Sequence, residues 1–241
     1  MKTAILTVLV MLTALVCGSA FGSQGDNTQN NDRLTLEQQR IVPIAAFTAD
    51  GDIDRLIPAL SKGLDDGLSI NEIKEVMVHL YAYTGFPRSL NALSALMKVV
   101  DQRKAKGIDD IQGKEASPVP PDFDREAYGA KVRAMLAGRK TDISGAPWQQ
   151  FSPAIDTFLK AHLFADIFVR DVISYQDREL ATIAALANMT GTRGQLGFHL
   201  KAAMNTGLSK AQIEDFVSVL ETTVGTAEAE SAGKILASVL N

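Results

Sequence analysis

Few side chains in this sequence can move a proton near neutral pH, because the chain has three histidines and one cysteine. Glu75, His79 and Tyr83 are spaced i, i+4 and i+8, which places them on one face of a predicted helix. His162 and Asp166 are also four residues apart. These spacings would suit an acid–base site or a polar contact between subunits. We interpret both groups as structural.

The single cysteine, Cys17, lies in a segment typical of a secretory signal peptide. An apolar run from Ala4 to Cys17 is followed by small residues, and the run is too short for an ordinary membrane span. We therefore expect a signal peptide over residues 1–22, a flexible leader over 23–34, and an exported bacterial protein, periplasmic or secreted. The mature chain would have no thiol and no membrane span, which excludes disulfides, thiolate catalysis and Cys-bound zinc.

The composition narrows the classes of partner. The formal net charge is −4 and basic residues are scattered among acidic ones, so no continuous basic surface for nucleic acid is expected. No His-x-x-x-His spacing or clustered ligand set appears, so the sequence predicts no metal site. A hydrophobic fraction of 46% can fill a sizeable core.

The elements that must position these residues are predicted to be helices. Capping-box pairs precede several apolar periodic segments, and alternating β-branched runs are absent, so the fold class is all-α. Pro58 should kink its helix or delay its start. The expected capping pairs are Thr35 with Gln38, Ser69 with Glu72, Thr192 with Gln195 and Ser209 with Gln212.

The chain is predicted to consist of two related halves. Gly67-Leu-Ser69 recurs 140 positions later as Gly207-Leu-Ser209. A Pro-rich linker over residues 107–122 would separate a first half, 35–106, from a second, 123–241. At the same offset Ala59 falls on His199, so the first half has no equivalent acid–base pair.

Several segments resemble carboxymuconolactone decarboxylases and their relatives, the alkylhydroperoxidase D proteins. The resemblance covers most of the mature chain and implies an all-α fold and subunits that assemble into rings. The segments are Arg178-Glu-Leu-Ala-Thr-Ile-Ala-Ala-Leu186, His199-Leu-Lys-Ala-Ala-Met204, Gly207-Leu-Ser209, Glu72-Ile-Lys-Glu75, Tyr81-Ala-Tyr-Thr-Gly-Phe-Pro87 and Leu90-Asn-Ala92.

The resemblance implies that Glu179 and His199 face each other in a pocket. A carboxylate can orient an imidazole, and the imidazole can move a proton on or off an enolizable carbon, so no metal or organic cofactor is implied. The Cys-x-x-Cys pair of the peroxidase relatives is missing, because that stretch reads Thr190-Gly-Thr-Arg-Gly-Gln195. Glu179 could instead be a first-turn glutamate, and His199 a buried structural histidine.

A substrate carboxylate could be held by Arg193 and the free N–H groups of its helix, although Arg193 could also be a surface arginine. Tyr81, Tyr83 and Phe86 from the first half could form aromatic walls, which would make a composite pocket.

The leading hypothesis is a cofactor-independent lyase or isomerase that acts on a small carboxylated lactone or related ring-cleavage product. The alternative is a non-catalytic binding or scaffold protein that keeps the fold without the thiols. By analogy with ring-forming relatives, two halves per chain suggest a homotrimer.

Overall fold

The computed structural model describes residues 32–241, and over this range it contains helices and no strand. The predicted all-α fold class is therefore confirmed. The helices are α1 (Leu36–Asp50), α2 (Ile53–Asp65), α3 (Ile70–Thr84), α4 (Phe86–Ala105), α5 (Arg125–Leu136), α6 (Pro147–Phe151), α7 (Pro153–Thr157), the π-helix η1 (Phe158–Ile167), α8 (Tyr175–Ala187), α9 (Arg193–Asn205), α10 (Lys210–Thr223) and α11 (Thr226–Leu240).

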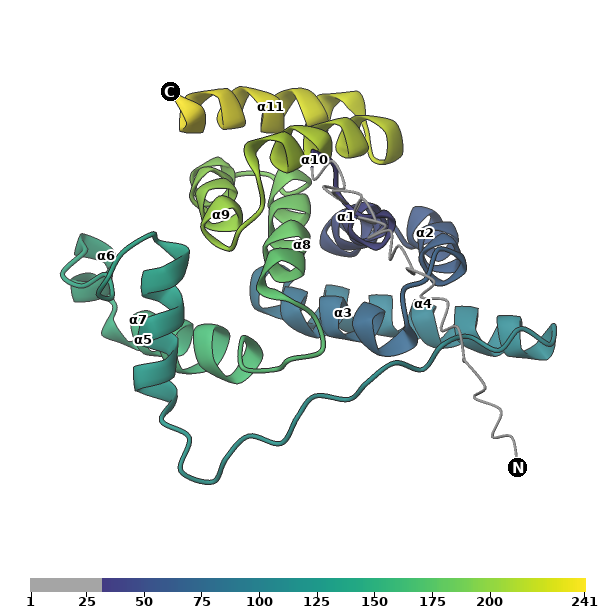
Figure 1. The fold of residues 1–241 in the computed structure, drawn as a ribbon, viewed down its shortest axis with the longest axis horizontal. Helices are drawn as coiled ribbons and strands as arrows, with labels where there is room; N and C mark the ends of the chain where they lie inside the picture. Colours follow the sequence, from purple (N-terminus) through teal and green to yellow (C-terminus); the bar gives the residue numbers. More distant parts are fainter. Residues whose placement is uncertain (1–31) are drawn as a thin grey trace, which may run out of the picture.

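Helices α1 and α8 pack against each other at the centre of the molecule (Figure 1). Helices α2, α3 and α4 pack against α1, and α3 also contacts α8. Helix α9 packs against α8, whereas α10 packs against α1 and α11 lies across α10 and α9. Helices α5, α6, α7 and η1 form a further group, in which α5 and η1 share a second, smaller core with Ala202 of α9. An extended segment between α4 and α5 runs along one edge of the molecule to reach this group.

Local capping explains where several helices begin. The capping boxes predicted at Thr35, Ser69 and Ser209 are all present and start α1, α3 and α10. A further box at Ser174 starts α8, one residue before Tyr175. Two turns also match in conformation, because Gly67 and Gly207 have φ angles of 108° and 109° and each stands two residues before one of these caps.

One local expectation is wrong, and of the two alternatives expected at Pro58, a kink or a delayed start, the delayed start is wrong. Thr192 stands at the N-cap of α9, but its side chain does not cap the helix and its hydroxyl donates instead to the carbonyls of Leu186 and Met189. Pro58 does not delay its helix, since α2 begins at Ile53 and continues past the proline. Pro58 is exposed, so the carbonyl left without its helical partner can bond water.

The predicted signal peptide, residues 1–22, lies outside the described residues, as does most of the leader. Within residues 32–241 no helix is both long and apolar enough to cross a membrane. Export, the domain boundaries and the homotrimer stay predictions.

Helices α5 and η1 approach each other closely at Gly129. A Cβ atom at this position would lie 1.9 Å from the backbone oxygen of Lys160, whereas a Cβ at the helical Gly233 would meet nothing closer than 3.7 Å. We expect Gly129→Ala to lower the free energy of unfolding by about 2 kcal/mol or more. Gly233→Ala should raise it by up to about 1 kcal/mol. Urea unfolding measures both, and equal effects would contradict this packing.

Candidate active site

Glu179 and His199 form a buried pair between α8 and α9. His199 Nδ1 lies 2.8 Å from Glu179 Oε2, and the glutamate side chain is fully buried. The imidazole therefore has a carboxylate partner rather than the backbone partner of a structural histidine. Because a carboxylate accepts hydrogen bonds, Nδ1 carries the proton, and Nε2 is the imidazole nitrogen left for another molecule.

His199 lines a cavity of about 430 Å³ that lies between the start of α9 and the α5–η1 group. Its volume is within the range of small-molecule sites. Most of the wall is apolar or aromatic. The lining residues are Arg133, Ile143, Trp148, Ile155, Leu159, Phe164, Gly194, Gln195, Phe198 and His199.

Among the described residues that line the cavity, Arg133 is the one arginine or lysine, and its charge is already neutralised. The Arg133 guanidinium donates to Asp142 at 2.7 and 2.6 Å and also to Asp156. Two carboxylates thus surround one guanidinium, which leaves little positive charge for an anion in the cavity. The role of Arg133 is instead structural, because its ion pairs join α5 to the loop at Asp142 and to the short helix α7 at Asp156.

The expected aromatic residues of the first half do not line this cavity. Tyr83 contacts His199 edge-on, with the two ring centroids 5.6 Å apart, but it does not line the cavity. Tyr81 and Phe86 stack on each other at 4.6 Å, and the Phe86 side chain is exposed. The aromatic wall comes instead from Trp148, Phe164 and Phe198 in the second half.

Arg193 does not join His199. It is exposed and lines a different hollow, together with Glu230 and Lys234 of α11. Its two neighbours in the sequence, Gly194 and Gln195, line the His199 cavity. Their backbone N–H groups have no hydrogen-bond partner among the described residues, as is usual in the first turn of a helix. The expected carboxylate ligand role of Arg193 stays a prediction.

A second buried polar cluster lies beside the pair and connects α3 to α8. Glu75 accepts from Arg178 at 2.7 Å and from Arg170 at 2.9 and 3.0 Å. Both Glu75 and Arg178 are buried, so each neutralises a charge that would otherwise be costly inside the protein. Through these ion pairs Glu75 joins α3 to α8 and to the segment before α8, and the structural role expected of Glu75 stays a prediction. Sequence reasoning missed Arg178 and Arg170 as its partners.

The cluster also determines the tautomer of His79. Thr182 donates its hydroxyl proton to the Arg178 carbonyl, so its oxygen must accept from His79 Nε2, 2.8 Å away. His79 Nδ1 then faces the Arg178 guanidinium at 3.5 Å. Burial lowers the pKa of His79 well below its usual range, and the Arg178 charge lowers it further. His79 is therefore neutral and unsuited to accept a proton.

Two buried oxygen atoms, one in the Glu179–His199 pair and one beside it, have no hydrogen-bond partner among the described residues. They are Oε1 of Glu179 and the hydroxyl oxygen of Tyr83. Burial raises the pKa of Tyr83, and the negative charge of Glu179 adds to the shift. The phenol is thus protonated and neutral throughout the physiological range, and its hydroxyl can donate or accept a hydrogen bond.

The depressed pKa of His79 makes stability depend on pH. The unfolded chain protonates this imidazole as the pH falls through about 6.5, whereas the folded protein does so only at lower pH. The free energy of unfolding should therefore decrease below about pH 6.5, by up to about 1.4 kcal/mol per pH unit. Urea unfolding at several pH values should show a shallower decrease in His79→Gln. An unchanged slope would mean that folded His79 titrates normally.

A comparison with protein families finds a match that includes the Glu179–His199 pair. Residues 153–238 match the model of the carboxymuconolactone decarboxylase family, and this range contains Glu179, His199 and most of the residues that line the cavity. None of the curated proteins compared with the chain matches it. From α7 to α11, the chain therefore carries a domain similar to those of the carboxymuconolactone decarboxylase family.

Proposed function

We propose that this protein is a cofactor-independent acid–base enzyme, a lyase or isomerase that acts on a small carboxylated lactone or related ring compound. The observation that carries the proposal is the Glu179–His199 pair at the edge of an apolar cavity. Glu179 holds Nδ1, so the proton-transfer atom is His199 Nε2. The family match over residues 153–238 supports the same reaction class.

The pair can carry out decarboxylation without a metal. When the substrate carboxylate leaves as carbon dioxide, its carbon–carbon bond breaks and the electron pair passes into the conjugated lactone carbonyl as an enolate. Protonated His199 then donates the Nε2 proton to the ring carbon, and solvent returns a proton to the imidazole. One proton is consumed for each carbon dioxide released. In an isomerisation, neutral Nε2 would take the proton from one carbon and return it to another.

The cavity suits a small ring with one anionic end. Trp148, Phe164 and Phe198 offer flat apolar surface to the ring. The unpaired N–H groups of Gly194 and Gln195 lie at the positive end of the α9 dipole, where they can bind a carboxylate or a lactone oxygen. These N–H groups take the place of the Arg133 charge, which its two aspartates have already neutralised.

The proposal predicts that His199→Gln abolishes turnover without unfolding the protein. The mature protein should release carbon dioxide from 4-carboxymuconolactone or from another member of a panel of carboxylated lactones. Losing the proton-transfer group should lower kcat at least roughly 100-fold. The fold can be checked by circular dichroism and thermal unfolding.

The matched control is His162→Gln, because His162 is a half-exposed histidine that also pairs with a carboxylate, Asp166, but does not line the cavity. This variant should keep wild-type turnover. Full activity in His199→Gln would refute the proposed mechanism. Binding of a lactone without turnover of any panel member would instead favour the non-catalytic binding protein.

A further inference from the structure

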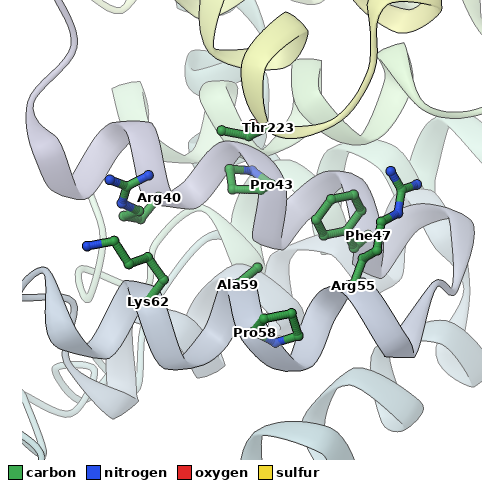
Figure 2. Close-up of a pocket in the computed structure, with 8 residues that line it drawn as sticks. All are labelled: Arg40, Pro43, Phe47, Arg55, Pro58, Ala59, Lys62 and Thr223. Carbon is green, nitrogen blue, oxygen red and sulfur yellow. The ribbon is translucent and has the colours of Figure 1, made fainter.

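A second hollow, of about 280 Å³, lies between α1 and α2 on the far side of the molecule from the α5–η1 group (Figures 1 and 2). Its floor is apolar and three basic side chains stand at its ends (Figure 2). Thr223 of α10 closes one side. The lining residues are Arg40, Pro43, Phe47, Arg55, Pro58, Ala59, Lys62 and Thr223.

This hollow corresponds in sequence position to the His199 cavity. Arg55, Pro58 and Ala59 line it from α2, and the residues 140 positions later are Gln195, Phe198 and His199, which line the other cavity from α9. Thr223 stands 140 positions after Tyr83. Three residues of this hollow therefore correspond to three residues of the His199 cavity wall, with Ala59 in place of the imidazole. None of the described residues that line the hollow can transfer a proton near neutral pH.

One end of the hollow carries a surplus positive charge. Arg40 and Lys62 both pair with the same carboxylate, that of Asp66, and the Lys62 contact is 2.5 Å. These two cations lower the pKa of Asp66, so the group holds two positive charges and one negative charge. Only Nε of Arg40 donates a hydrogen bond among the described residues, so both of its terminal nitrogens are available.

The other end has no such surplus. Arg55 lies 2.7 Å from Asp52 and 3.6 Å from Asp50, and its guanidinium packs 4.3 Å from the centre of the Phe47 ring. It also donates to the carbonyl of Val224. Arg55 is thus neutralised and held in place, and its role is to tie α2 to the end of α10.

We infer that this hollow is a second, non-catalytic binding site, selective for a small monocarboxylate with a compact apolar body. The carboxylate lies at the end formed by Arg40 and Lys62, where the net charge of +1 matches a monoanion. The apolar body lies on Pro43, Pro58 and Ala59, which point into the hollow between the two helices (Figure 2). This site is separate from the proposed proton-transfer site.

The experiment uses benzoate as the probe and the Ala59 methyl group as the reporter. Alanine-methyl-labelled mature protein is titrated with benzoate, and the saturable shift of the Ala59 methyl resonance gives a dissociation constant for this hollow alone. We expect benzamide, which has the same shape without the charge, to bind much more weakly. Lys62→Gln should weaken benzoate binding roughly fivefold, because it removes the surplus charge and leaves the Arg40–Asp66 pair intact.

The matched control is Lys210→Gln, because Lys210 is also paired with an acidic residue four positions later on an exposed helix face. It changes the net charge equally and should leave the dissociation constant unchanged. His199→Gln should also leave it unchanged, which separates this site from the proposed function. No saturable Ala59 shift with millimolar benzoate would overturn the inference. Equal affinity for benzamide, or equal weakening by Lys62→Gln and Lys210→Gln, would overturn it as well.

Discussion

The structure depends on burying two opposite charges side by side on the central helix. Arg178 and Glu179 of α8 are both fully buried. A buried charge without a partner would cost several kcal/mol. The partners must come from elsewhere in the chain, so Glu75 of α3 meets Arg178 on one side and His199 of α9 meets Glu179 on the other. These two contacts fix the positions of α3 and α9 along α8.

This arrangement gives the two buried histidines different properties. His79 donates through Nε2 to Thr182 and faces a guanidinium, so it stays neutral and structural. His199 donates through Nδ1 to a carboxylate and keeps Nε2 for the cavity. The chemistry we propose therefore follows from the partner that α8 offers to each imidazole, since both rings are buried to a similar degree.

Much of the local structure could be predicted from the sequence, because a capping box is a contact between residues three apart. Ser69 and Ser209 start their helices as expected. The closeness of Glu179 and His199 could also be expected, through the resemblance. The wall of the cavity could not, because Arg133, Trp148 and Phe164 come from a poorly patterned segment whose packing depends on long-range contacts.

The direction in which the Arg193 side chain points could not be predicted from the sequence either. The sequence correctly places it in the first turn of α9, but whether it points toward His199 or toward α11 depends on packing that no local pattern encodes. Its neighbours Gly194 and Gln195 face the cavity instead. Comparing positions 140 residues apart was more informative, since three such pairs line the two cavities, namely Arg55 and Gln195, Pro58 and Phe198, and Ala59 and His199.

The central claim is that Glu179 holds Nδ1 of His199 and leaves Nε2 for the substrate. Nitrogen NMR of the histidine side chains in alkaline buffer tests it most directly, because the two nitrogens of a neutral imidazole have different shifts with and without a proton. We predict that His199 carries its proton on Nδ1 and that His79 carries its proton on Nε2. A His199 imidazole protonated on Nε2 would contradict the account.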